Sequence, residues 1–425
     1  MKRGSAALIA ILAVAIVLRV HWNDVSQYSP ADESVYTSYT QHLLDRGFAA
    51  GYPEIVRWFD DPRMWRYPNP LRFGHLALTT AAAEIYGAAE PRALAWLSTV
   101  AGILVVPLLY LLASRLFDRR TGLLAAAFGA VSAIEIAMGR RALQDEVFCA
   151  AVLIALILVI QVMERGNRWD IAAAVAALSA ALAIKESLLL LDPAFAAVIL
   201  AYRKFRPRHL LLFALPPIVD YTAFSVLAHD FRAWFSIGRR VWGATASEYV
   251  LQYQGGPPHR LLIDFFATAP FVSLLAAAAV AVALLGRDHG PRIRALALFA
   301  VVSIGVLAII PSKNLRFAIM IDPVVQILAA WLLAVPAATG RALSSVALTT
   351  AALANGAIEI ELFHVVFIRG GVYDPVTATL LQSLGAVPHS TGTADAPLLF
   401  PWICAALFAI AWLVERARMR SAPHP

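Results

Sequence analysis

The chain has 425 residues, of which 60% are hydrophobic and 15% charged, and its formal net charge is +7. A water-soluble domain does not tolerate so apolar a surface, so the composition excludes an ordinary soluble protein and makes membrane lipid a predicted partner. The positive charge does not indicate nucleic acid, because the Lys and Arg residues stand in short clusters between apolar runs. Cys149 and Cys404 both lie inside apolar runs and predict neither a disulfide nor a metal site.

The apolar runs predict an all-α polytopic membrane protein. A helix needs about 20 mostly apolar residues to cross the hydrocarbon core, since lipid offers no partners for unpaired backbone groups. We therefore predict about a dozen spans in one transmembrane domain over residues 1–425. No small-residue cleavage site follows the first apolar run, which predicts a retained helix. The expected helices cover residues 5–20, 93–113, 122–138, 146–163, 170–184, 187–202, 209–227, 264–285, 295–310, 318–335, 342–358 and 398–414.

The basic clusters predict the orientation of the chain. With the N-terminus in the cytoplasm, they all fall in cytoplasmic loops, as the positive-inside rule requires. The sequence thus predicts a multi-pass protein of the plasma (inner) membrane. These clusters are Lys2 and Arg3; Arg115, Arg119 and Arg120; Arg165 and Arg168; Arg203, Lys204, Arg206 and Arg208; Arg287, Arg292 and Arg294; Arg341; and Arg416, Arg418 and Arg420.

Three long segments are expected on the extracytoplasmic side: residues 21–92, 228–263 and 359–397. The first is predicted to contain two amphipathic helices, near 32–46 and 71–86. The helix-breaking run Tyr67-Pro68-Asn69-Pro70 separates them. Tyr67, in this loop, and Tyr373, in the last one, are candidate residues for the acceptor side of a site.

Ionisable residues at the outer helix ends are the candidate site residues, because charge near hydrocarbon is costly. Asp32 and Glu33 follow the first helix, where a carboxylate could take a proton from a hydroxyl group. A structural alternative is that Ser29, Pro30 and Asp32 cap the next helix.

Several cations lie on the side where the positive-inside rule does not expect them. They indicate an anionic partner, and a lipid-linked phosphate would suit them. One alternative pairs Arg140 and Arg141, in the outer turn between the third and fourth helices, with Asp145 and Glu146. Another makes Lys185 and Glu186 an internal ion pair. The cations concerned are Arg140, Arg141, Lys185, Lys313 and Arg316.

Other chemistries find little support in the sequence. No Walker loop, dinucleotide fingerprint or nucleophile elbow occurs in a suitable context, which disfavours nucleotide-driven chemistry. Five histidines are outer or interfacial, and none has the spacing of a metal site, so they are interpreted as ordinary interfacial residues. They are His42, His75, His229, His259 and His364.

In the order of its motifs the chain resembles the GT-C superfamily of membrane glycosyltransferases. The similar branches are protein O-mannosyltransferases, lipid A aminoarabinose transferases and archaeal Agl-type proteins. The chain departs from them in having Phe317 where members commonly have Tyr, and in lacking the large soluble C-terminal domain of some branches. The motifs are Asp32-Glu33, the inner turn 114–120, Arg141 to Asp145, Lys185-Glu186 and Lys313 to Pro323.

The resemblance implies an enzyme that transfers a sugar from a polyprenyl phosphate to a hydroxyl acceptor on a glycan, lipid or protein. By this likeness Asp32 is the general base of an inverting reaction, and Asp145 is the second acidic position. Arg141, Lys313 and Arg316 would then bind the donor phosphate. The resemblance implies no certain cofactor and leaves a divalent cation beside Asp145 open.

Two other classes of function remain open from the sequence. A flippase or transporter of lipid-linked sugar would also need many helices and buried charge. A non-catalytic assembly factor with a GT-C-like fold would need neither the carboxylate nor the cations. Only the enzyme requires a carboxylate beside the phosphate, so Asp32→Asn discriminates it from a transporter. In an assembly factor, substituting Arg141 or Lys313 by Ala would leave the affinity for the carrier lipid unchanged.

Overall fold

The computed structural model describes residues 2–21, 32–65, 67–244, 255–286, 289–334 and 343–369. These ranges contain helices and no strand, which confirms the predicted all-α fold class. The helices of the bundle are α1 (Lys2–His21), α5 (Pro91–Leu116), α6 (Arg119–Val131), α7 (Ala133–Gly139), α8 (Asp145–Arg165), α9 (Arg168–Ile184), α10 (Asp192–Ala201), α11 (Leu211–Ala228), α14 (Arg260–Thr268), α15 (Pro270–Leu285), α16 (Pro291–Ile309), α17 (Asp322–Ala334) and α19 (Ser345–Leu362).

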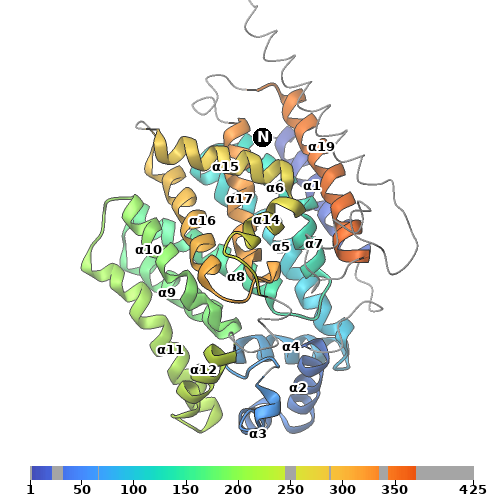
Figure 1. The fold of residues 1–425 in the computed structure, drawn as a ribbon, viewed down its shortest axis with the longest axis vertical. Coiled ribbons are helices and arrows are strands. Elements are labelled where there is room, and N and C mark those ends of the chain that lie inside the picture. The colour runs from blue at the N-terminus through green and yellow to red at the C-terminus, as the bar shows by residue number, and fades with distance from the viewer. Residues whose placement is uncertain are drawn as a thin grey trace, which may run out of the picture.

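Four further helices lie together at the end of the bundle away from the N-terminus: α2 (Asp32–Arg46), α3 (Phe48–Trp58), α4 (Phe73–Tyr86) and α12 (Ala233–Ala244) (Figure 1). We call them the helical layer. A separate apolar core that includes Tyr36, Tyr52 and Phe224 joins them to α11. The hydroxyls of Tyr39 and Tyr52 donate to the carbonyls of Pro68 and Pro70, which fixes the course of the chain between α3 and α4.

The described residues include six helical segments that are long and apolar enough to cross a membrane, or seven if α6 and α7 form one bent span. The chain is therefore an integral membrane protein, and the count of about a dozen spans stays a prediction. The expected helix 398–414 lies outside the described residues. The six segments are Pro91–Leu116, Asp145–Arg165, Pro207–Ala228, Pro291–Ile309, Leu315–Ala334 and Val346–Ile368.

Three predicted helices are interrupted in the structure. The run 122–138 bends by 57° between α6 and α7 at Ser132, whose side chain accepts from the N–H of Glu135. The run 264–285 is divided into α14 and α15 just before Pro270, which has no N–H to continue the first helix. The run 187–202 consists of a 3₁₀ segment, η3 (Glu186–Leu191), followed by the short α10.

A second 3₁₀ segment, η5 (Leu315–Ile321), precedes α17 in the same way. Both segments end where an Asp-Pro pair begins an α-helix, at Asp192 and at Asp322. Both also begin beside a cation, Lys185 for η3 and Arg316 for η5. The two segments therefore bring basic side chains to the end of the bundle that faces the helical layer.

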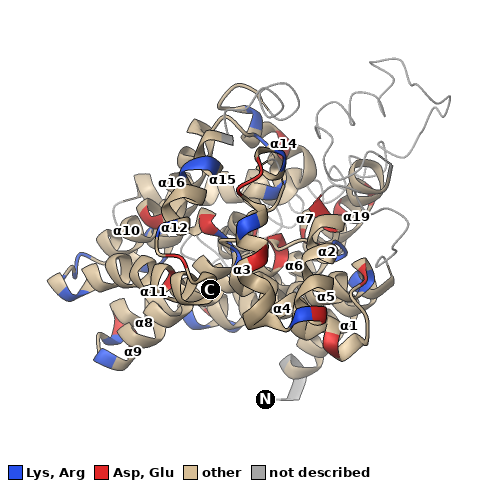
Figure 2. Cartoon of the chain, turned by 90° about the horizontal axis from the view of Figure 1, so that it is seen from below, with Lys and Arg blue, Asp and Glu red and all other residues tan. Residues whose placement is uncertain are grey.

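The opposite end of the bundle carries a different set of charges. Arg115, near the end of α5, donates to Gln161 and Glu164 near the end of α8. Arg292, at the start of α16, also pairs with Glu164. Viewed from the side of the helical layer, acidic and basic segments lie near one another in the middle of the molecule (Figure 2).

Candidate active site

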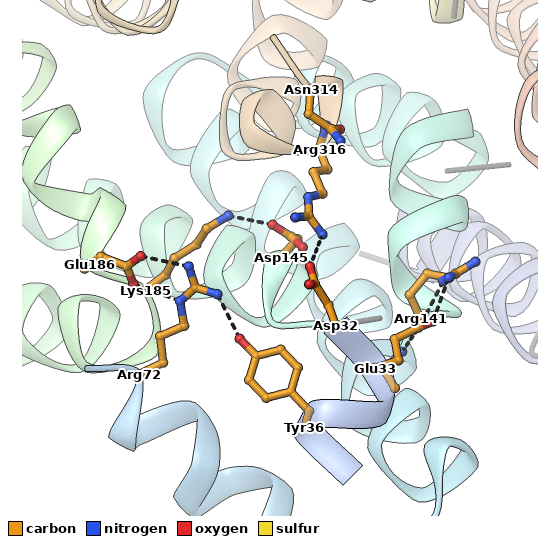
Figure 3. A network of polar contacts seen from close by, with 11 residues as sticks. Asp32, Glu33, Tyr36, Arg72, Arg141, Asp145, Lys185, Glu186, Asn314 and Arg316 are labelled. Carbon is orange, nitrogen blue, oxygen red and sulfur yellow. Dashed lines mark hydrogen bonds and ion pairs between the residues drawn. The ribbon is translucent and has the colours of Figure 1, made fainter. Parts of the chain in front are cut away.

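Four ion pairs gather where the bundle meets the helical layer (Figure 3). Their side chains come from the start of α2, the start of α4, the turn between α7 and α8, the end of α9 and the two 3₁₀ segments. We call these eight residues the paired-charge site, which holds four formal negative and four formal positive charges. The pairs are Asp32–Arg316 at 3.0 Å, Glu33–Arg141 at 2.7 Å, Asp145–Lys185 at 2.6 Å and Glu186–Arg72 at 2.7 Å.

Asp32 is the most loosely held carboxylate of the site. Its Oδ2 accepts from Arg316, and within the described residues this is its one hydrogen bond. The Asp32 side chain is 20% exposed. The backbone of Arg316 is fixed at the start of η5, because the side chain of Asn314 accepts a hydrogen bond from its N–H. A carboxylate with one partner and access to solvent can exchange that partner for a substrate group.

Glu33, the next residue, is fixed much more firmly. Both its oxygens accept from the guanidinium of Arg141, at 2.8 and 2.7 Å, and one also accepts from the backbone N–H of Ala142. The side chain is 1% exposed. Such bidentate contacts are among the stronger hydrogen bonds in proteins. Glu33 therefore ties α2 to the turn before α8 and so holds Asp32 in position.

Asp145 and Lys185 form a buried pair. The Lys185 ammonium also lies 5.5 Å from the ring centre of Phe148 and 5.0 Å from that of Phe317. The aromatic rings favour a cation at this place. Phe317, where similar families commonly have Tyr, thus covers a charge of the site.

Arg72 is a site residue that the sequence analysis did not select. Its guanidinium donates to both oxygens of Glu186 and to the hydroxyl of Tyr36, and Asn69 donates to the same carboxylate. Burial alone would raise the pKa of Glu186, but Arg72 outweighs burial and lowers it to about 2. The signal available in the sequence was a cation two residues after the Tyr67–Pro70 breaker, on the side of the membrane poor in positive charge.

The structure corrects two alternative pairings. Lys185 and Glu186 do not pair with each other, because Lys185 binds Asp145 and Glu186 binds Arg72. Arg141 does not pair with Asp145 or Glu146, because its guanidinium forms an ion pair with Glu33 of α2. Adjacent residues at a helix end point in different directions, so neighbours in sequence take partners from different elements.

The other predicted site residues lie outside this network of pairs. The Lys313 ammonium donates to the carbonyls of Ala308 and Ile310 at the end of α16, where unpaired carbonyls favour a cation. Arg140 is buried with its guanidinium 5.8 Å from the ring centre of Phe363. Tyr67 is partly buried. Tyr373 lies outside the described residues, as do Ser29 and Pro30.

The carboxylates do not fit a divalent cation. Asp32 and Asp145 each face a cationic side chain at 3.0 Å or less. In the described ranges, no three His, Cys, Asp or Glu side chains are arranged to bind a metal ion. The chemistry of the site is accordingly derived from its own side chains.

Two kinds of similarity to known proteins bear on this site. The sequence pattern of the dolichyl-phosphate-mannose-protein mannosyltransferase family matches residues 73–220, less than half of the chain. That segment includes Arg141, Asp145 and Lys185 but neither Asp32 nor Arg316. No curated protein is significantly similar in sequence.

Solved structures with a similar fold span most of the chain. ArnT from Cupriavidus metallidurans in the apo state has a TM-score of 0.56 at 14% identity, over 96% of this chain and 76% of that one. The crystal structure of the same protein bound to undecaprenyl phosphate has a TM-score of 0.54 at 16% identity, over 95% of this chain and 77% of that one. A third similar structure is that of AglB from Archaeoglobus fulgidus, an archaeal oligosaccharyltransferase in complex with an inhibitory peptide and a dolichol-phosphate. Its TM-score is 0.53 at 12% identity, over 100% of this chain and 56% of that one.

These similarities define the chain as a polytopic membrane protein with the fold of the GT-C glycosyltransferases, as the sequence resemblance predicted. The matched segment, residues 73–220, is similar in sequence to the mannosyltransferase family named above. At such low identities the structural likeness establishes the fold.

Proposed function

We propose that the protein transfers a sugar from a polyprenyl phosphate to a hydroxyl group of an acceptor glycan, lipid or protein. The observation that carries this proposal is the 3.0 Å pair between Asp32 and Arg316, which joins a loosely held carboxylate to a cation suited to phosphate. The matched mannosyltransferase segment supports a lipid-linked donor. So do the similar folds bound to undecaprenyl phosphate and to a dolichol-phosphate.

In the proposed reaction Asp32 is the general base. Its carboxylate takes the proton of the acceptor hydroxyl while that oxygen forms a bond to the anomeric carbon of the sugar. The bond from that carbon to the phosphate oxygen breaks, and the electron pair leaves with the phosphate. Attack opposite the leaving group inverts the anomeric centre. A positioned base contributes about 10²- to 10⁴-fold in rate.

Arg316, Lys185 and Arg72 are the proposed ligands of the donor phosphate. Each already lies beside a carboxylate, so the incoming phosphate would share the cation with that carboxylate or replace it. The cations would then stabilise the negative charge that develops on the leaving oxygen. Asp145 would then orient Lys185. Arg141 and Glu33 would position α2 rather than touch the donor, because their pair is both bidentate and almost fully buried, with side chains 4% and 1% exposed.

The site is proposed to face the extracytoplasmic side of the plasma (inner) membrane. Support comes from the charges at the two ends of the bundle. Arg115 and Arg292 meet Glu164 at the end opposite the helical layer, and the basic loops of the sequence follow that end. Cytoplasmic loops carry the excess of Lys and Arg. The helical layer, with Tyr67, would then meet the acceptor outside the cell.

The test compares Asp32→Asn with Asp60→Asn. Asp60 also pairs with an arginine, at 3.1 Å from Arg240, but its side chain is 72% exposed. Protein in nanodiscs is given radiolabelled undecaprenyl-phosphate mannose or dolichyl-phosphate mannose together with envelope extract as the source of acceptor. We expect Asp32→Asn to lower sugar transfer about 100- to 10,000-fold, with carrier-lipid binding retained and Asp60→Asn close to wild type.

The same assay separates the alternatives. A flippase or transporter would move the labelled lipid across a vesicle membrane whether or not Asp32 is present. A non-catalytic assembly factor would show no transfer in the wild type and no loss of carrier-lipid binding in Arg316→Ala. Transfer that is equal in Asp32→Asn and wild type contradicts the proposed role of Asp32.

A further inference from the structure

His75, in the first turn of α4, is a buried polar residue that the proposed mechanism does not use. His75 as a whole residue is 1% exposed. Among the residues that the structure describes, neither ring nitrogen has a hydrogen-bond partner. Leaving a buried polar group without a partner is costly. The sequence interpretation of His75 as an ordinary interfacial histidine is therefore wrong.

The ring is held against the paired-charge site. It meets the ring of Tyr36 edge-on, with centroids 4.8 Å apart and an interplanar angle of 79°. The hydroxyl of Tyr36 accepts from Arg72, one turn before His75 on α4. At Gly74 a Cβ atom would lie 2.9 Å from the Cβ of Ala183, so the absence of a side chain there lets α4 approach the end of α9 beside Lys185.

The charged groups around His75 set its protonation. Burial and, next, the Arg72 guanidinium lower its pKa to about 3, with Lys185 acting in the same direction and Asp145 opposing them. The imidazole is therefore neutral at any pH above that value. A neutral imidazole has one N–H donor and one nitrogen acceptor.

This chemistry does not suit a phosphate. Three cations of the paired-charge site, Arg72, Lys185 and Arg316, are available for the phosphate, and a neutral ring adds no charge to them. A hydroxyl group, in contrast, both donates and accepts, so it can satisfy a neutral imidazole from either side. Of the two parts of a sugar phosphate, the sugar carries such groups.

We propose that His75 is a specificity-determining residue that forms hydrogen bonds with hydroxyl groups of the donor sugar. The proposal rests on the proposed function, because it assumes that the carrier phosphate binds at the neighbouring cations. It assigns the contact with the sugar to α4, on the side of Arg72, and leaves the contact with the acceptor to Asp32.

The test measures binding of two lipids that differ only in the sugar: undecaprenyl-phosphate mannose and bare undecaprenyl phosphate. His75→Phe keeps a ring against Tyr36 and removes both polar nitrogens, whereas His75→Gln keeps a donor and an acceptor. The control is His42→Phe, because the Nε2 of His42 lies 2.8 Å from a carboxylate oxygen of Glu54, outside the paired-charge site. All proteins are the full chain in nanodiscs.

In His75→Phe we expect affinity for the mannose-bearing lipid to fall about 5- to 10-fold, as for the loss of one or two hydrogen bonds. Affinity for bare undecaprenyl phosphate should stay within about twofold, and His75→Gln should recover part of the loss. If His75→Phe does not fold, His75→Gln is compared with wild type for its preference among mannose-, glucose- and galactose-bearing lipids, which should change.

An equal loss for both lipids means that His75 only supports the packing of Tyr36, and it overturns the proposal. Unchanged affinity for both lipids, or unchanged sugar preference in His75→Gln when that variant alone folds, overturns it as well. Failure of the proposed function has a different signature, because the wild-type protein would then transfer no sugar from undecaprenyl-phosphate mannose, whatever its affinities for the two lipids.

Discussion

Two groups of buried charges among the described residues differ in the balance between acidic and basic side chains. In the paired-charge site each of four carboxylates has its own cation, at 2.6 to 3.0 Å. In the second group, four acidic residues are buried near one another, three of them close to Arg19, in what we call the acid-rich cluster. Its members are Arg19, Glu135, Glu146, Asp322 and Glu359.

The acid-rich cluster connects helices rather than offering a binding site for an anion. Arg19 of α1 donates to the carbonyls of Gly129 and Ala130 and pairs with Glu135 at 3.2 Å. Ser132 donates to Asp322 of α17. Gly102 of α5 leaves room for the Arg19 side chain, because a Cβ atom at Gly102 would lie 2.9 Å from the Arg19 Nε.

The difference teaches where a phosphate can bind. An anion entering the acid-rich cluster would meet an excess of carboxylates, whereas in the paired-charge site it meets cations that can be shared. Changes in the acid-rich cluster should therefore act on stability, and changes in the paired-charge site on activity.

The largest effect on stability is expected for Arg19→Met. Removing the one arginine leaves buried carboxylates without their cation, which costs about 3–5 kcal/mol of unfolding free energy. Denaturation in mixed detergent micelles measures this loss, and any folded protein should still bind undecaprenyl phosphate. A variant with wild-type stability would show that the two regions do not differ as described.

Arg316→Ala should act in the opposite way. Removing a cation that stabilises the developing charge is expected to lower sugar transfer about 100- to 1,000-fold. The thermal midpoint should fall little, because Asp32 is part-exposed. The matched control is Arg63→Gln, which breaks a surface pair with Asp61 at 2.6 Å. Transfer near the wild-type rate would contradict the role of Arg316.

Glu186→Gln tests whether a pair in the site also supports the fold. The folded-state pKa of Glu186 is about 2, below the ordinary value of 4.5. Its contribution to stability, about 3 kcal/mol, is therefore complete above pH 4.5 and is lost as the pH falls toward 2. The difference in unfolding free energy between wild type and variant should be large at pH 7 and smaller at pH 3. A gap that is independent of pH would contradict the Arg72–Glu186 assignment.

Asp60→Asn gives the smallest effect. Its pair with Arg240 is largely exposed, so its loss should change the unfolding free energy by less than about 1 kcal/mol and leave transfer unchanged. A larger change in either measurement would mean that exposed and buried pairs contribute alike, and the comparison would lose its basis.

Much of the site could be predicted because charge at a membrane helix end is rare. Asp32, Arg141, Asp145, Lys185 and Arg316 were found in this way. Their partners could not be predicted, since Asp32 and Arg316 are 284 positions apart and no spacing rule joins them. Arg72 was missed because it follows a run of breakers that drew attention to the turn.

The fold shows the same limit. Apolar length identified the spans, but it could not distinguish one helix from the 3₁₀ segment and short helix over residues 187–202, because apolar runs lack a period there. Lys313 was grouped with the phosphate ligands by its side of the membrane and by the family resemblance. Its ammonium instead caps α16, a choice set by local backbone carbonyls.

The most direct measurement is a cryo-EM structure of the Asp32→Asn protein in a nanodisc with undecaprenyl-phosphate mannose. We expect phosphate density within hydrogen-bond distance of Arg316 and of Lys185 or Arg72, with the sugar next to residue 32. Phosphate density at the opposite end of the bundle, or beside Arg19, would contradict it.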